Sequence, residues 1–428
     1  MDSWYRIDNT GKIFHAVSNT DNSYVFRVSM LMRETVDPEM LQEALDVISP
    51  RFPTLTVRVR KGLFWDYMEK NDEVLLVQKE KDYPCAPIKP SESRGYLLRV
   101  LYFGRKISVE IFHSLTDGTG ATEFLKTLVY QYLQYRKRDV TDEGIILLPE
   151  EDPDSQETED SFSHYADNID RNVFRKEDKP SYQITGTPLR TEGMNMIHGI
   201  MDASVVNNYA KSLGTTLTGF LTALMIQVIG KEALLKSSRP KKVTIAVPVN
   251  LRRQFPSKTL RNFFSVANIG ATIDEKASFE DILKVVNGEL VKRTGKPSLQ
   301  KGINQHVYLQ KSFMTRTIPV FLKYPAMRYG FNYIGERTKT LTMTNMGNVS
   351  LPSSMSGHVE RMELAFYTTV KSPVGCGIAT ANNRMTVTFS LSITETDIVR
   401  DFFNELMKHV DVDIEVYSNE WGKHDETM

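Results

Sequence analysis

The chain has 428 residues, of which 41% are hydrophobic and 25% are charged. This length suggests two or three folding units, which bury enough apolar surface to fold without disulfides or a structural metal. The 53 basic residues balance the 53 acidic ones, which argues against a dedicated nucleic-acid binder, because such proteins carry a basic excess. Cys85 and Cys376 are too few for a disulfide framework, so a reducing, cytoplasmic setting is predicted.

Neither a targeting signal nor a membrane span is expected. Residues 1–19 mix charged and aromatic side chains and lack the apolar centre of a signal peptide. The most apolar stretch, Phe220–Ile229, is interrupted by Thr222 and Gln227. It is much shorter than the roughly 20 residues that a span needs. We interpret it as a buried helix.

Strand and helix patterns alternate through the first 140 residues. Asp37-Pro38 predicts the start of a helix, because aspartate caps helices and proline suits the first helical position. A second amphipathic helix is expected over residues 124–133. Strands are expected at four segments: Tyr24–Met32, Thr54–Arg60, Tyr96–Phe103 and Lys106–His113.

The composition changes after residue 140. Residues 142–160 hold nine acidic side chains and no basic ones. We interpret residues 141–195 as an exposed, largely solvated acidic linker or crossover.

The same alternation restarts in the second half. Helices are expected after Asp202, after Thr215 or Thr216, at Phe279–Lys292 and at Asp397–Val410. The expected strands are Val243–Val249, Phe263–Thr272, Leu341–Val349, Val359–Thr369 and Met385–Ile393. We therefore predict an α/β (α+β) fold of two domains with mixed sheets flanked by helices and a channel between them. The domains would span residues 1–140, with part of the linker, and residues 196–428.

The clearest chemical pattern is His113-Ser-Leu-Thr-Asp117-Gly118, where a predicted strand meets a predicted helix. His113 continues the apolar face of the strand, so its side chain is expected to point inward. The near-neutral pKa of an imidazole suits general base catalysis at cellular pH. Asp117 is placed to form an ion pair that fixes the turn, and Gly118 allows a tight bend.

Two plainer interpretations of these residues stand beside this one. His113 can be a core histidine, with Asp117 merely capping the following helix. The pair can also be part of a metal site, but no further histidine or cysteine lies nearby to complete a ligand set. We expect no metal.

The motif matches the H-x-x-x-D-G signature of the chloramphenicol acetyltransferase-like superfamily, which the chain resembles over nearly its whole length in element order. That superfamily includes alcohol O-acetyltransferases, plant BAHD acyltransferases and the condensation domains of nonribosomal peptide synthetases. Three further segments are similar to its conserved stretches: Ser49–Leu55, Val247–Phe264 and Thr344–Pro352. The resemblance implies two chloramphenicol acetyltransferase-like domains with a tunnel at their interface.

Two departures from the superfamily pattern favour its alcohol acetyltransferase branch. Condensation domains usually have two adjacent histidines, whereas Phe112 precedes His113 here. The D-F-G-W-G segment of the plant enzymes is absent, and Asn345-Met-Gly347 stands where it would fall.

The resemblance implies direct acyl transfer from a thioester, usually acyl-CoA, to a hydroxyl or sometimes an amine of a small molecule. His113 would take the proton of the acceptor during attack and return it to the leaving thiolate. Acyl-CoA would be a co-substrate, and no bound cofactor is expected. The aspartate of this motif typically pairs with an arginine, for which Arg58 is the first candidate and Arg99 its rival.

Other site residues are weaker candidates. The developing oxyanion needs a hydrogen-bond donor, and the candidates on one predicted strand are Thr342, Thr344 and Asn345. Residues 236–261 hold eight basic and no acidic side chains, which suit the phosphates of CoA or form a solvated surface. The candidates for CoA binding there are Arg252, Arg253, Lys258 and Arg261.

We therefore predict a monomeric, acyl-CoA-dependent O-acyltransferase. One alternative is a condensation-type enzyme that takes its acyl group from a carrier protein. The other is a non-catalytic scaffold, which the intact His113 and Asp117 disfavour. The sequence leaves the acceptor and the acyl chain length open.

Overall fold

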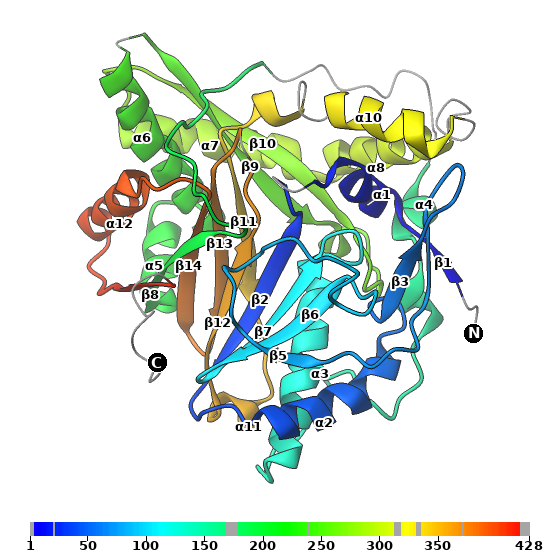
Figure 1. Cartoon of the computed structure of the whole chain (residues 1–428). Helices are drawn as coiled ribbons and strands as arrows, with labels where there is room; N and C mark the ends of the chain where they lie inside the picture. The colour runs from blue at the N-terminus through cyan, green and yellow to red at the C-terminus, as the bar shows by residue number, and fades with distance from the viewer. Residues whose placement is uncertain are drawn as a thin grey trace.

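Two large mixed sheets with helices on their outer faces make up the molecule (Figure 1). The computed structural model describes residues 4–19, 22–167, 179–237, 239–311, 318–330, 335–369 and 371–419. Parallel and antiparallel neighbours occur in both sheets. The predicted α/β fold with mixed sheets and flanking helices is therefore confirmed.

The first sheet has five strands in the order β12-β2-β7-β6-β5. Its strands are β2 (Val25–Met32), β5 (Val77–Lys79), β6 (Leu98–Phe103), β7 (Lys106–Phe112) and β12 (Val359–Phe366). Helix α3 (Gly118–Tyr135) packs on β2 and β7, and α2 (Pro38–Ile48) packs on α3. The Asp37 side chain caps α2 by accepting from two backbone amides, as its position before Pro38 predicts.

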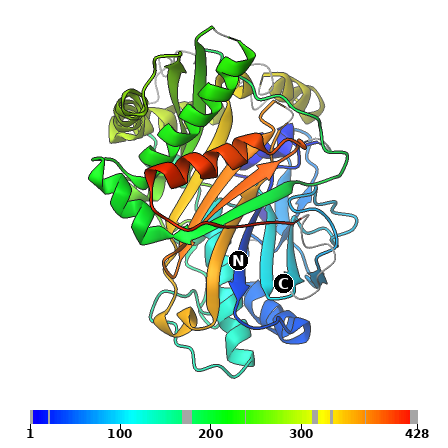
Figure 2. The same cartoon turned by 90° about the vertical axis from the view of Figure 1, so that its left-hand side faces the viewer.

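The second sheet has seven strands in the order β10-β9-β11-β13-β14-β8-β15. Its strands are β8 (Asn195–Asp202), β9 (Lys241–Asn250), β10 (Phe264–Ile273), β11 (Leu341–Asn348), β13 (Val374–Ala381), β14 (Arg384–Leu391) and β15 (Glu415–Ser418). Its helices are α5 (Ala203–Ser212), α6 (Leu217–Lys236), α7 (Phe279–Thr294) and α12 (Asp397–His409). Figure 2 shows α12 lying across the outer face of this sheet.

Smaller elements complete the described chain. A three-stranded sheet contains β1 (Trp4–Arg6), β3 (Val57–Arg60) and β4 (Tyr67–Lys70). The remaining helices are α1 (Asn9–Val17), α4 (Ser161–Tyr165), α8 (Lys296–Lys311), α10 (Val320–Gly330) and α11 (Ser353–Ser356). Short 3-10 turns cover Ser49–Arg51, Ser155–Thr158, Leu251–Arg253 and Glu336–Thr338. Helix α1 packs against α8 and α10, so the start of the chain contacts the second half.

Strand β12 lies in the second half of the sequence but joins the first sheet. It pairs antiparallel with β2 of the first sheet and packs closely against β13 of the second. A Cβ at Gly377 would lie 2.3 Å from the backbone oxygen of Leu364, so glycine allows this close approach. The domain limits at 140 and 196 stay a prediction, but the second half contributes one strand to the first sheet.

The described part of the acidic segment is largely exposed or half-buried, as predicted, but it also makes one buried contact with the first half that the prediction did not include. Residues 168–178 lie outside the described part of the chain, but Glu157 is buried and bonded to Arg51 through both carboxylate oxygens, at 2.6 and 2.8 Å. Its backbone oxygen accepts from the amide of Leu260. The segment therefore ties the first half to the loop between β9 and β10.

Helix α6 contains the apolar stretch that the sequence interprets as buried. By length and composition alone it passes as one candidate membrane span, yet 72% of its most apolar window is buried inside the protein. The core helix of a globular protein has the same properties, and α6 packs on α7, α12 and the second sheet.

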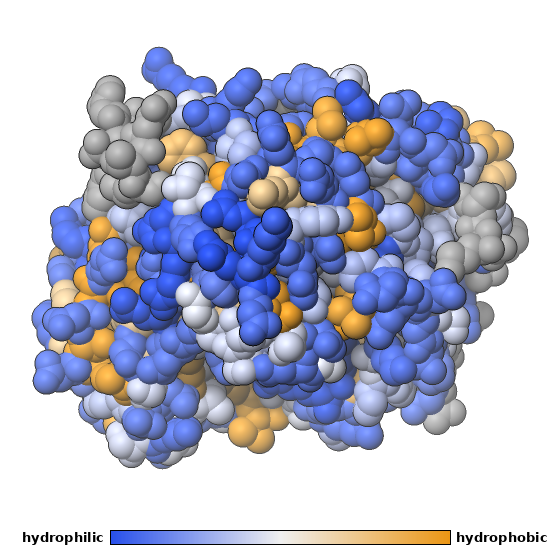
Figure 3. Space-filling model, turned by 90° about the horizontal axis from the view of Figure 1, so that it is seen from below, coloured by the Kyte–Doolittle hydropathy of each residue, from blue (hydrophilic) through white to orange (hydrophobic). Residues whose placement is uncertain are grey.

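The face of the molecule seen from below in Figure 3 is mainly hydrophilic, with apolar residues in scattered small groups. Scattered apolar residues of this kind are normal on protein surfaces.

The Arg51–Glu157 pair generates a prediction about stability. Glu157→Met leaves the guanidinium of Arg51 buried without its partner, which costs about 3–5 kcal/mol of unfolding free energy. The control is Glu192→Met, because Glu192 pairs with Lys89 at the exposed surface. Urea unfolding should show a much lower midpoint for Glu157→Met than for the control. Equal midpoints would contradict the structural role of the pair.

Candidate active site

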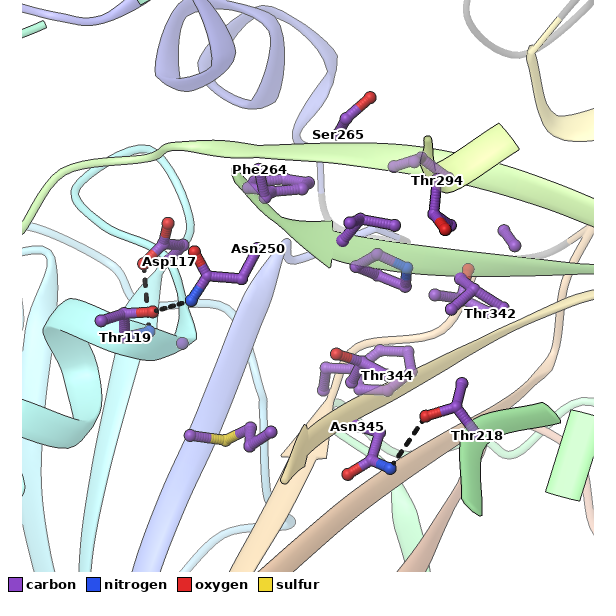
Figure 4. Close-up of a pocket in the computed structure, with 18 of the residues that line it drawn as sticks. Asp117, Thr119, Thr218, Asn250, Phe264, Ser265, Thr294, Thr342, Thr344 and Asn345 are labelled. Carbon is purple, nitrogen blue, oxygen red and sulfur yellow. Dashed lines mark hydrogen bonds between the residues drawn. The ribbon is translucent and has the colours of Figure 1, made fainter. Parts of the chain in front are cut away.

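A cavity of about 1490 Å³ opens where the two halves of the chain meet. It is lined by α1 and α3 from the first half and by β9, β10 and β11 from the second, several of whose residues Figure 4 draws. Single-ligand pockets usually measure about 300–1,000 Å³. The cavity therefore has room for two ligands at once.

His113 lines this cavity at the end of β7, as its inward position in the sequence predicts. Its backbone N–H donates to Tyr24 O over 2.9 Å, which extends the pairing with β2 by one residue. Three phenyl rings surround the imidazole, with centroid distances of 4.4 Å to Phe14, 4.8 Å to Phe26 and 5.4 Å to Phe264.

The aromatic rings around His113 affect the protonation state of its imidazole. Burial lowers the pKa of the imidazole below its ordinary value of 6.5, because a low-dielectric site disfavours the charged form. Asp117 and Asn262 oppose this shift but do not cancel it. The ring is therefore neutral at neutral pH and has a lone pair that can accept a proton.

Asp117 uses both of its carboxylate oxygens and is almost fully buried. Oδ1 caps α3 by accepting from the backbone amides of Thr119, at 3.0 Å, and Gly120. Oδ2 accepts from Arg252 Nη1 and from the backbone amide of Phe263, both at 2.8 Å. One side chain thus joins the start of α3 to the β9–β10 loop of the second half.

The arginine partner of Asp117 is Arg252, which corrects the candidates Arg58 and Arg99. Arg58 pairs with Glu69 across two antiparallel strands, and Arg99 pairs with the buried Glu110 beside it in the first sheet. Both neighbours are set by strand register, which the sequence alone does not reveal.

Arg252 and Arg261 are structural, which corrects two of the candidates for CoA binding. Arg252 donates to the backbone oxygens of Thr259 and Arg261 as well as to Asp117. Arg261 is buried and lies 3.8 Å from Asp8. Lys258 is exposed, pairs with Asp154 and does not line the cavity. Of the four candidates, Arg253 alone lines it.

All three candidates for oxyanion donors line the cavity from β11. Alternation predicts that Asn345 faces away from Thr342 and Thr344, but the register of β11 shifts after Asn345 and this residue also reaches the cavity. Asn345 Nδ2 donates to Thr218 Oγ1 at 3.1 Å, as Figure 4 shows. The structure groups the three residues and leaves the choice among them open to experiment.

Gly118 begins α3 and lines the cavity, but the predicted tight bend that would require glycine there is not found. A Cβ on Gly118 would meet only the Met346 side chain, at an ordinary 3.8 Å, and its φ is not positive. A Cβ on Gly120 would lie 2.2 Å from the backbone oxygen of Leu260. Gly120 is therefore the residue that lets α3 approach the β9–β10 loop.

Two side chains behind His113 are absent from the site residues expected from the sequence, although Asn262 lies within the Val247–Phe264 segment. Asn262 Oδ1 lies 3.1 Å from His113 Nδ1, and the Asn262 amide in turn contacts Asp8. Their separation along the chain hides this contact from motif analysis. Among the described residues, no group of three or more metal-ligating side chains forms a candidate metal site.

The sequence matches no protein-family model and no curated protein. Its fold matches solved structures over nearly the whole chain. The first condensation domain of the calcium-dependent antibiotic synthetase is 12% identical, with a TM-score of 0.60 and coverage of 95% of this chain and 96% of that one. A trichothecene 15-O-acetyltransferase from Fusarium sporotrichioides is 10% identical, with a TM-score of 0.58 and coverage of 95% and 94%.

A third match is polyketide synthase associated protein 5 from Mycobacterium tuberculosis, at 13% identity, a TM-score of 0.58 and coverage of 94% and 96%. At such identities the likeness establishes the fold, which is that of condensation domains and of this acetyltransferase. The superfamily that the motif indicates and its alcohol acetyltransferase branch both stay predictions.

The contacts of Asp117 generate a prediction about the loop that it holds. Asp117→Asn keeps an oxygen for the helix cap but turns an amide towards the donors Arg252 and Phe263. The loss of the buried charge partner lowers the unfolding free energy by about 3–5 kcal/mol, and looser packing behind His113 lowers turnover. The control is Asp202→Asn, because Asp202 caps α5 at the surface. Equal urea midpoints for the two variants would contradict the role of Asp117.

Proposed function

We propose that the protein is an acyltransferase that moves an acyl group from a thioester to a hydroxyl or amine acceptor in the cavity between its halves. The observation that carries this proposal is a neutral, partly buried imidazole on a cavity that both halves line. Asp117 fixes the loop next to that imidazole. A scaffold has no need of this arrangement, and the fold supports an enzyme of the acyl-transfer or condensation type.

His113 acts as the general base. An alcohol is far less acidic than an imidazolium, so its proton passes to His113 while its oxygen attacks the thioester carbonyl. The tetrahedral oxyanion that forms is stabilised by a donor on β11, for which Thr342, Thr344 and Asn345 are placed. Collapse expels the thiolate, which takes the proton back from His113. No side chain becomes acylated.

Acyl-CoA is the proposed donor and no bound cofactor takes part. Arg253 is the residue of the four original candidates that stays available at the cavity for a phosphate of CoA. Since Arg252 and Arg261 are committed to internal contacts, only part of the basic stretch is left for a nucleotide. Because so few basic residues are left for the nucleotide of CoA, a carrier-protein thioester is the second candidate donor. Thiol release with acyl-CoA and with the same acyl group on a phosphopantetheinyl carrier protein separates the two.

The proposal predicts the effect of His113→Ala. A positioned general base contributes roughly 10²–10⁴-fold to rate, so turnover of a responsive acceptor should fall by about that factor while thioester binding is retained. The control is His198→Ala, because His198 is buried but hydrogen-bonds Thr388 inside the second sheet, away from the cavity. Acceptors are first found by thiol release with acetyl-, medium- and long-chain acyl-CoA across alcohol and amine panels.

Three results contradict the proposal. One is near-normal turnover by His113→Ala. Another is a His198→Ala variant, corrected for folded fraction, that loses as much activity. The third is a stable mass increase of the protein after incubation with acyl-CoA alone, since direct transfer leaves the protein unmodified.

A further inference from the structure

Two buried side chains stand behind His113, on the side of Nδ1. Asp8 caps α1, where Oδ1 accepts from the backbone amide of Gly11 at 2.6 Å. Asn262 Nδ2 donates to Asp8 Oδ2 at 3.2 Å and to the backbone oxygen of His113 at 3.1 Å. Asn262 Oδ1 lies 3.1 Å from His113 Nδ1. The exposed fractions of Asp8 and Asn262 are 2% and 1%.

These contacts allow only one orientation of the Asn262 amide. A backbone carbonyl and a carboxylate can only accept hydrogen bonds, so the NH₂ group must face both of them. The reversed amide would place its oxygen against two acceptors in a buried site, which is costly. The amide oxygen therefore faces the imidazole.

The orientation of Asn262 then favours one nitrogen of His113 as the carrier of the proton, and hydrogen bonds to the backbone of His113 and Thr116 also act on the ring. An amide oxygen only accepts, so Nδ1 must be the donor and must bear the hydrogen. We propose that Asp8 and Asn262 are positioning residues that hold neutral His113 in the Nδ1–H tautomer and leave the lone pair on Nε2. This inference rests on the proposed function, in which Nε2 receives the proton of the acceptor.

Asp8 is suited to this role as a carboxylate. Arg261 Nε lies 3.8 Å away, and both Gly11 and Asn262 donate to its oxygens. Burial raises the pKa of Asp8, while these three groups oppose that rise by stabilising the charged form. The His113 carbonyl fixes the Asn262 amide independently, so the arrangement has two anchors.

The same helix also supplies the ring that stacks on the imidazole. Asp8 caps α1 at its beginning, and Phe14 of α1 stacks on His113. Helix α1 thus orients the imidazole ring of His113 and fixes its tautomer, although the helix begins more than 100 residues before His113 in the chain.

The discriminating variant is Asp8→Asn. Asparagine caps helices as well as aspartate does, so the fold is kept. The Gly11 amide holds the oxygen of the new side chain, and its NH₂ group then faces the NH₂ group of Asn262. The His113 carbonyl still favours the original orientation, so the Asn262 amide now divides between two orientations, and the reversed one presents its NH₂ group to Nδ1 and allows the Nε2–H tautomer. The matched control is Asp37→Asn, because Asp37 caps α2 and does not line the cavity.

The tautomer is read from ¹⁵N–¹H correlations of protein labelled at its histidine ring nitrogens, at a pH where His113 is neutral. The His113 signals are assigned by their loss in His113→Ala.

Wild type and Asp37→Asn should show the Nδ1–H pattern, and Asp8→Asn should gain the Nε2–H pattern. Asn262→Leu, which cannot accept from Nδ1, should lose the Nδ1–H preference as well. In both variants turnover should fall roughly 10–100-fold, with the donor KM unchanged.

An Nε2–H pattern in the wild type overturns the inference. So does an Asp8→Asn spectrum equal to that of Asp37→Asn, or, if Asp8→Asn does not fold, an unchanged pattern in Asn262→Leu. The spectra need no substrate. A wild type that shows the Nδ1–H pattern but transfers no acyl group would therefore defeat the proposed function and leave the tautomer assignment standing.

Discussion

The arrangement of the site depends on the buried carboxylate of Asp117. One of its oxygens caps α3 of the first half, and the other binds Arg252 and the Phe263 amide of the second half. The loop that it holds carries Asn262, which contacts His113 from behind. Because Asp117 is buried, neither its charge nor its hydrogen-bonding capacity can be left unmatched without a large cost. The requirement to satisfy this one side chain fixes the two halves relative to the imidazole.

Other contacts repeat this connection between the halves. Strand β12 extends the first sheet, Glu157 joins Arg51 to the Leu260 backbone, and α1 packs on α8. The glycines at 120 and 377 leave room for backbone to approach backbone at these crossings. The cavity lies between the two halves that these contacts hold together, and residues from both sheets line it. Such a site can bring two substrates together and exclude bulk water from the reacting atoms.

Local features of the fold and site were predictable from the sequence, and long-range contacts were not. Capping at Asp37, the alternation that ends at His113, and the helix after Asp117 are short-range patterns, and the structure contains them. Which arginine meets Asp117 depends on how the halves dock, so Arg58 was the wrong candidate. Strand β13, Val374–Ala381, was missed because its glycines and alanines give little strand signal. Asp8 carries no motif, and Asn262 lies in a segment that resembles the superfamily, but the contact of either residue with the site becomes visible only in three dimensions.

The central claim is that the thioester reacts beside His113 inside this cavity. The most direct measurement is a crystal structure of the protein with an acyl-CoA analogue whose sulfur is replaced by a methylene group. The account predicts an acyl carbonyl in the cavity, one hydroxyl group away from His113 Nε2, with its oxygen directed at β11. An analogue bound outside the cavity, or with its carbonyl out of reach of an acceptor that touches His113, would contradict it.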